Sequence, residues 1–426
     1  MKTVIFVFIF TITTLTSAQN YNYARLIVDT LASTRYAGRG YIDGGLSRAA
    51  EFITREFRLH NVNSYGASFH HYFRHPVNTF PGRMELSINK QKLTPGEDFI
   101  VDPFSPGITG NYQAVIIEER KIQNRDYLGA RLQKSRGKII VIDRREPLVL
   151  PKTEQHNVDD LINMIKYAPN MPHTATIVLT NDKLTWGVAT KQSNRPVIIV
   201  KAGSLNIIKA NNISINIEAK LEKNFKAANI AGYIDGTFSD SVLLITAHYD
   251  HLGKMGTETI FPGANDNASG IAMLLSLASY FNENPVDYDV VFFALASEEA
   301  GLLGAKEMTE NPPFDLSLVK FMINFDLAGT GDKGIKVVNG SVFREEFDRL
   351  SLINDSAGLL PSVQIRGEAC NSDHCPFYQK GVPCFYIYTL GGIDAYHDIH
   401  DRPETLPLTE FEEYFTLVTY FLESFQ

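Results

Sequence analysis

The sequence contains few cysteines and no run of basic residues. Its 426 residues include three cysteines, one tryptophan, and 40 lysines and arginines against 48 aspartates and glutamates, for a formal net charge of −8. A chain without a basic field does not attract a polyanion, so we exclude nucleic acid as a partner. The hydrophobic content of 44% is enough to bury a large core, and the length allows two or three domains.

The apolar segment at the N-terminus is too short to span a membrane. Residues 1–18 combine Lys2, an apolar stretch and the small residues Thr16 and Ala18 before Gln19, a pattern typical of an export signal. The stretch is shorter than the ~20 residues of a membrane span, and no positive flank follows it. We therefore expect a secreted protein, periplasmic or extracellular, with no stable membrane insertion after removal of this signal.

The three cysteines, Cys370, Cys375 and Cys384, lie close together near the C-terminus. In an oxidising compartment they allow one disulfide and one free thiol, and a bond between Cys370 and Cys375 would close a short loop. Three buried thiols that pack as small apolar residues are the alternative. A zinc site made of cysteines is disfavoured, because nearby histidines and carboxylates offer a better ligand set.

The hydrophobic pattern changes twice along the chain. Residues 19–75 begin with two stretches of helical periodicity separated by a glycine-rich loop. Residues 76–225 contain short β-rich runs among polar turns, which indicates an inserted domain with strands of its own. In residues 226–426 continuous apolar strands alternate with helices. This pattern predicts an α/β fold whose mixed, mostly parallel central sheet is flanked by helices.

Histidines and acidic residues follow the apolar strands of residues 226–426. In open α/β sheets, ligands bind beyond the carboxyl ends of the strands, so these side chains are expected to meet at one edge. The turn at 261–270 adds Asp266 near the start of a helix, where a carboxylate either caps the helix or joins the cluster. The candidates at the strand ends are His248, Glu298, Glu299, Asp326, His397 and His400.

This combination of side chains predicts a divalent metal centre. Imidazole nitrogens and carboxylate oxygens without clustered thiolates suit zinc. Five protein ligands exceed what one catalytic zinc needs, which indicates two zinc ions per chain bridged by one carboxylate. Of the neighbours Glu298 and Glu299, one can bind metal while the other accepts a proton from water. Asp250 is placed to hydrogen-bond the second ring nitrogen of His248, or simply to form the turn.

Six stretches in order give the chain a resemblance to the di-zinc aminopeptidases of metallopeptidase family 28. The insert at 76–225 is similar to the protease-associated domains that such secreted enzymes often carry, and LASTRYAGRG at 31–40 is similar to the family's N-terminal segment. The six stretches are TAHYDHLG, GANDNASG, ASEEAGLLGA, INFDLAG, SDHCPFYQKGVP and YHDIHDRPETL.

The resemblance implies a zinc peptidase domain at 226–426 and a role for each candidate residue. Glu298 is implied as general base, and His400 is left without a role. The implied activity is a secreted zinc-dependent aminopeptidase that hydrolyses N-terminal residues from peptides, with water activated by two zinc ions and the glutamate. The implied ligands are His248, Asp266 and Asp326 for one zinc ion, and Asp266, Glu299 and His397 for the other.

Some alternatives remain open at the level of sequence. Some family members place a tyrosine before the SDH motif to stabilise the oxyanion, and here GEACN stands there. Ser372, Asp373 and His374 are too close in sequence for a catalytic triad and are expected to fix their loop. A glutaminyl cyclase or carboxypeptidase-like enzyme of the same fold, and a non-catalytic receptor-like module, are the alternative functions. The oxyanion role can pass to the metal or to one of the later tyrosines, Tyr386, Tyr388 and Tyr396.

Overall fold

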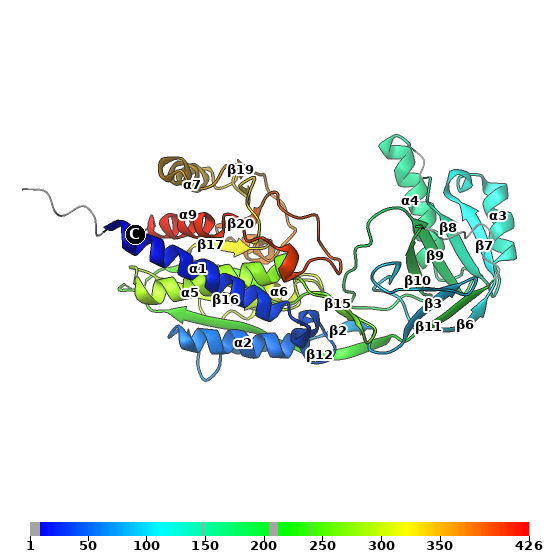
Figure 1. Cartoon of the computed structure of the whole chain (residues 1–426), viewed down its shortest axis with the longest axis horizontal. Coiled ribbons are helices and arrows are strands. Elements are labelled where there is room, and N and C mark those ends of the chain that lie inside the picture. The colour runs from blue at the N-terminus through cyan, green and yellow to red at the C-terminus, as the bar shows by residue number, and fades with distance from the viewer. Residues whose placement is uncertain (1–8, 147–148, 204–211, 239, 426) are drawn as a thin grey trace, which may run out of the picture.

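The computed structural model of the chain describes residues 9–146, 149–203, 212–238 and 240–425 (Figure 1). Its centre is a nine-stranded sheet in the order β1-β12-β16-β13-β17-β20-β18-β19, with β2 paired to β12. The strands are β1 (Asn63–Ser64), β2 (His70–Thr79), β12 (Lys220–Ile234), β13 (Val242–His248), β16 (Asp289–Leu295), β17 (Val319–Phe325), β18 (Ile335–Val338), β19 (Val363–Ile365) and β20 (Cys384–Thr389).

The four central strands β16, β13, β17 and β20 are parallel, and antiparallel strands flank them on both sides. Successive residues of a strand point to opposite faces of the sheet. Leu243 and Ile245 accordingly pack into one hydrophobic cluster, whereas Val242 and Leu244 pack into another. Both faces are therefore buried, and the predicted mixed, mostly parallel α/β fold is confirmed.

Helices cover both faces of this sheet. One face packs against α1 (Ile9–Leu31), α2 (Gly45–Leu59), α5 (Gly270–Glu283), α7 (Arg344–Ala357) and α9 (Phe411–Glu423). The other packs against α6 (Leu303–Glu310) and α8 (His374–Gln379). Part of the predicted export signal, residues 1–8, lies outside the described residues, and its remainder begins α1. Among the described helices, none is both long enough and apolar enough to cross a membrane.

Residues between β2 and β12 form two smaller sheets, which lie at one end of the molecule (Figure 1). The core between them includes Trp186, Ile198 and Ile215, and α3 and α4 pack on the outer side of the five-stranded sheet. One sheet consists of β5 (Phe99–Val101), β10 (Val197–Lys201), β9 (Ala175–Thr180), β8 (Ile139–Asp143) and β7 (Ala114–Glu118), and the other of β4 (Gln91–Leu93), β3 (Met84–Ile88), β11 (Ile213–Ile217) and β6 (Ile108–Tyr112). The helices are α3 (Arg125–Lys134) and α4 (Lys152–Tyr167).

The division into domains at residues 75/76 and 225/226 stays a prediction. Strands β2 and β12 run across both of these positions and pair with each other from the main sheet into the insert. The insert also buries part of the main segment, because Met255 and Phe261 of the hairpin β14 (Gly253–Met255) and β15 (Thr259–Phe261) belong to its hydrophobic core. The two parts therefore share structure at the end where the parallel strands terminate.

Candidate metal centre

A cavity of about 370 Å³ opens at the carboxyl ends of the central strands. The structure brings the predicted metal-binding residues and Glu298 together in its wall. His248 ends β13, Asp326 follows β17, and Glu298 and Glu299 follow β16. The lining residues are His248, Asp266, Glu298, Glu299, Asp326, Leu327, Arg366, Asn371, Tyr386, Tyr388, Tyr396 and His397.

Asp266 lies between two groups of side chains and directs one carboxylate oxygen to each. Its Oδ1 is 3.4 Å from Nε2 of His248, and that nitrogen is 3.3 Å from Oδ1 of Asp326. Its Oδ2 is 3.1 Å from Nε2 of His397, and that nitrogen is 3.3 Å from Oε2 of Glu299. A carboxylate in this position has the geometry needed to bridge two cations.

His251 also reaches the second group, and the sequence analysis missed it. It is buried, and its Nδ1 lies 3.0 Å from Oε1 of Glu299 and 3.8 Å from Oδ1 of Asp266. Neither nitrogen of His251 nor Oε1 of Glu299 has a hydrogen-bond partner among the described residues. The sequence signal was its position three residues after His248, in the turn that follows the same strand.

Unpartnered donor atoms that converge inside a protein fit a metal ion. A buried polar atom without a hydrogen bond is costly, and close carboxylates cannot all be ionised without a cation nearby. His248, Asp266 and Asp326 form one set of atoms close enough to hold an ion, and His251, Asp266 and Glu299 form another. Nitrogen and carboxylate oxygen donors of this kind suit zinc.

The electrostatics of the cluster reflect its crowded carboxylates. Burial raises the pKa of Glu298 well above its usual value, and the charge of Glu299 adds to this effect. Burial also raises the pKa of Glu299, to about 8. Burial opposes ionisation of Asp266 as well, but its hydrogen bond to His397 and the surrounding histidines hold its pKa below the usual value. Of these three carboxylates, Asp266 therefore most favours its charged form.

Asp250 supports the site differently from the prediction. Nδ1 of His248 is 3.2 Å from the backbone carbonyl oxygen of Asp250, whereas the Asp250 carboxylate is 3.8 Å away, too far for a hydrogen bond. The carboxylate instead accepts hydrogen bonds from the backbone N–H groups of Glu298 and Glu299 and from the hydroxyl of Tyr41. Asp250 thus orients the strand end that carries both glutamates.

The N-terminal segment supplies a buried arginine that fixes the turn carrying Asp266. The guanidinium of Arg39 donates hydrogen bonds to five backbone carbonyl groups, among them those of Gly263 at 2.6 Å and Asp266 at 3.2 Å. Arg39 is fully buried, and burial lowers its pKa to about 10. The sequence analysis noted the LASTRYAGRG stretch, which contains Arg39, but did not predict that Arg39 fixes the turn carrying Asp266.

The insert holds His397 in place through the backbone of Trp186. The N–H of Trp186 donates to the carbonyl oxygen of His397 at 2.8 Å, and the carbonyl oxygen of Trp186 is 3.1 Å from Nδ1 of His397. This second contact leaves Nε2 of the ring free to face Asp266. Lys183 adds an ion pair of 2.6 Å to Asp398.

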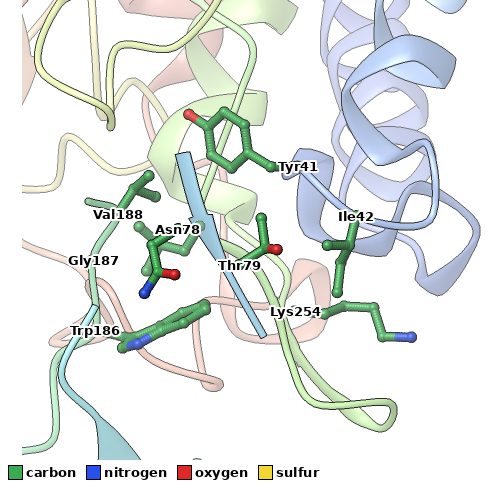
Figure 2. A pocket seen from close by; sticks show the side chains of 9 residues that line it. Tyr41, Ile42, Asn78, Thr79, Trp186, Gly187, Val188 and Lys254 are labelled. Carbon is green, nitrogen blue, oxygen red and sulfur yellow. The ribbon is translucent and has the colours of Figure 1, made fainter. Parts of the chain in front are cut away.

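Trp186 is itself anchored where the insert meets the main segment. Its indole N–H donates to the carbonyl oxygen of Val101, and its ring stacks on Phe261. Figure 2 shows it at a small pocket together with Asn78 of β2 and Tyr41 of the N-terminal segment.

The loop at 366–375 closes another side of the cavity. Cys370 and Cys375 form a disulfide, and Cys384 is a buried free thiol, so the alternative of three free thiols is wrong. Ser372 donates to Oδ2 of Asp326 at 2.8 Å. Asp373 and His374 are buried behind it.

His400 lies away from this cavity and is exposed. Tyr386, Tyr388 and Tyr396 all line the cavity, so the structure leaves the choice among them open.

Solved structures with this fold include zinc aminopeptidases. The chain superposes on a zinc aminopeptidase from Bacillus subtilis with a TM-score of 0.67 at 18% identity, covering 95% of this chain and 94% of that one. A peptidase M28 precursor from Shewanella amazonensis gives a TM-score of 0.67 at 16% identity, with 96% of both chains covered. The chain therefore has the fold of these proteins.

The sequence comparisons match part of the chain to one peptidase family. Residues 229–422 match the model of Peptidase family M28. A probable leucine aminopeptidase of Trichophyton verrucosum is 28% identical over 206 residues, covering 45% of this chain and 55% of the relative. Aminopeptidase YwaD of Bacillus subtilis is 28% identical over 148 residues, covering 33% of this chain and 30% of the relative. The chain spans about half or less of the length of these curated relatives.

Proposed function

We propose that the protein is a secreted, zinc-dependent aminopeptidase that hydrolyses N-terminal residues from peptides. The observation that carries this proposal is the position of Asp266, with one carboxylate oxygen directed to each of two groups of metal-binding side chains. The match of residues 229–422 to the model of Peptidase family M28 and the relatives named as aminopeptidases support it. The disulfide between Cys370 and Cys375 supports an oxidising compartment.

Two zinc ions are proposed at the two groups. His248, Asp266 and Asp326 would hold one ion, and Asp266, Glu299 and His397 would hold the other, with His251 also within reach of the second. When bound, the ions would lower the pKa of the attacking water and polarise the scissile carbonyl.

Glu298 is proposed as the general base. It lines the cavity but forms no ion pair with a histidine of the cluster, in contrast to Glu299. Its carboxylate would take the proton from the attacking water and then give it to the departing amine. The Asp250 carboxylate, bound to the backbone N–H of Glu298, would keep the strand end in position during both transfers.

Hydrolysis of aminoacyl-p-nitroanilides by the purified protein, before and after removal of metal by a chelator, tests this proposal. We expect hydrolysis that chelation abolishes and zinc restores. Cyclisation of N-terminal glutamine without hydrolysis would favour the cyclase instead. Failure to bind zinc or to turn over any substrate would favour a receptor-like module.

A further inference from the structure

The walls of the cavity beside the proposed metal centre are mostly polar. Leu327 is the only aliphatic residue among the described residues that line it. A site that selects a large aliphatic side chain needs an apolar pocket. The apolar surface that these walls offer comes from Leu327 and from tyrosine rings, not from an aliphatic pocket. The lining residues outside the proposed metal and base set are Leu327, Arg366, Asn371, Tyr386, Tyr388 and Tyr396.

Arg366 is the single lysine or arginine among the described lining residues, and its position is fixed. It follows β19, where its N–H donates to the carbonyl oxygen of Val337 at 2.9 Å and its carbonyl oxygen accepts from Ser341. Its guanidinium Nη1 donates to the hydroxyl of Tyr388 at 3.2 Å. The backbone of Arg366 is thus fixed by two hydrogen bonds, and its guanidinium is fixed in the cavity wall by Tyr388.

The guanidinium of Arg366 has no anionic partner among the described residues. Within the described part of the chain, its side chain forms one hydrogen bond, to the neutral hydroxyl of Tyr388, and no ion pair. A guanidinium presents five N–H donors whose planar arrangement matches a carboxylate. Arg366 therefore has donors left to bind an anion in the cavity.

The charge balance of the cavity points to an anion from the substrate. Four carboxylates line the wall, those of Asp266, Glu298, Glu299 and Asp326, and two divalent ions would balance them. Among the described lining residues, Arg366 then remains the one positive charge that these carboxylates do not balance, and a peptide's free amine adds a second one. A carboxylate on the substrate would offset this excess.

We propose that Arg366, held by Tyr388, binds a carboxylate of the substrate, and that the enzyme therefore prefers peptides with an acidic group near the scissile bond. This inference rests on the proposed aminopeptidase function. The carboxylate can come from the side chain of an N-terminal aspartate or glutamate, or from the free C-terminus of a very short peptide. Both sources present the same chemistry to the guanidinium.

Two matched substrate pairs distinguish these sources. Glutamyl-alanine amide against glutaminyl-alanine amide isolates the charge of the side chain. Glutaminyl-alanine against glutaminyl-alanine amide isolates the charge of the C-terminus. The zinc-loaded protein is assayed on each pair, and the ratio of kcat/KM within a pair is measured. This ratio does not depend on the fraction of protein that is folded.

We expect the wild-type protein to favour the charged member of at least one pair by roughly 10- to 100-fold, the range of a charge-assisted hydrogen bond. Arg366→Gln should bring that ratio close to one, and Arg366→Lys should retain part of it. Arg344→Gln is the matched control, because Arg344 is exposed on α7 and pairs with Asp348. It should leave the ratio unchanged.

Two other outcomes overturn the inference, and they differ from each other. Equal rates within both pairs, or a preference that Arg366→Gln does not alter, would reject the role of Arg366 and leave the aminopeptidase proposal intact. No hydrolysis of any of these substrates or of the p-nitroanilides would reject the proposed function, and the inference would fail with it.

Discussion

Glu298 and Glu299 show how two identical neighbouring residues acquire different tasks. The N–H groups of both are bound by Asp250, but only Glu299 lies within ion-pair distance of His251 and His397. Glu298 faces the cavity without such a partner. The difference follows from the direction in which each side chain leaves the strand end.

Replacement of Glu298 by glutamine should separate catalysis from metal binding. A neutral amide cannot accept the proton, so we expect kcat to fall by about 10²- to 10⁴-fold. The zinc content measured by atomic emission should stay at the wild-type value. Glu310→Gln, an exposed change at the end of α6, is the control and should leave both quantities unchanged. Full activity in Glu298→Gln would assign the proton transfer to another group.

Replacement of Arg39 by methionine should destabilise the whole protein. It leaves five buried carbonyl groups without their donor, and we expect the free energy of unfolding to fall by about 3–5 kcal/mol in urea titrations. Arg35→Met, at an exposed position of the same segment, should change it by less than about 0.5 kcal/mol. Equal effects of the two changes would contradict the structural role of Arg39.

Site residues that directly follow strands were predicted from the sequence. The contribution of His251 and the hydrogen bonds of Asp250 were not. His248, Glu299, Asp326 and Glu298 follow apolar runs, so their meeting at one edge could be expected from the fold class. His251 and the hydrogen bonds of Asp250 depend on the path of the chain after β13, which no periodicity specifies.

At the scale of elements, the strands of the central sheet could be predicted from the sequence because both faces of the sheet are buried. Continuous apolar runs such as SVLLITA and DVVFFALA became β13 and β16. The long pairing of β2 with β12 was not predicted, because its residue pairs, from Lys220 with Thr79 to Ile230 with His70, lie far apart in the sequence and are joined through the backbone. Such a contact leaves no pattern in either segment alone.

His173, two residues before β9, is a histidine whose burial should make the insert sensitive to acid. Burial and the nearby charge of Arg195 lower the pKa of His173 from 6.5 to about 4. The unfolded chain therefore binds more protons between these two values, and the contribution of His173 to stability is complete above pH 6.5 and is lost as the pH falls towards 4.

Because of this histidine, we expect the free energy of unfolding of the insert to fall by about 1–2 kcal/mol on acidification, after allowance for solvent screening. Urea unfolding followed by the fluorescence of Trp186, which lies in the core of the insert, measures this at pH 7 and pH 4.5. His173→Gln should lose less stability between these conditions than wild type. His156→Gln, at an exposed site on α4, should behave like wild type. Identical losses in all three proteins would reject this role of His173.

At the scale of the whole molecule, the insert and the proposed metal centre are mechanically connected. Segment 183–188 of the insert contacts the loop that carries His397 through Trp186 and Lys183. Sequence reasoning described the insert as a separate β-rich domain, because a contact between two loops has no signature in composition.

Loss of the Lys183 ion pair should weaken zinc binding. The ion pair of Lys183 with Asp398 holds the residue next to His397, so Lys183→Met should lower the affinity for one of the two proposed zinc ions by about 10-fold. The fluorescence of Trp186, the only tryptophan in the sequence, reports this during zinc titration of the metal-free protein. Lys191→Met, which removes a lysine placed over Phe104, is the control. Unchanged affinity in Lys183→Met would show that the insert does not support the metal centre.

The central claim is that Asp266 joins two zinc sites at the edge of the sheet. Anomalous X-ray diffraction at the zinc edge, from crystals of the zinc-loaded protein, tests it most directly. The account predicts two peaks about 3.5–4 Å apart, with a carboxylate oxygen of Asp266 about 2.0–2.2 Å from each. A single peak, or two peaks of which only one lies beside Asp266, would contradict it.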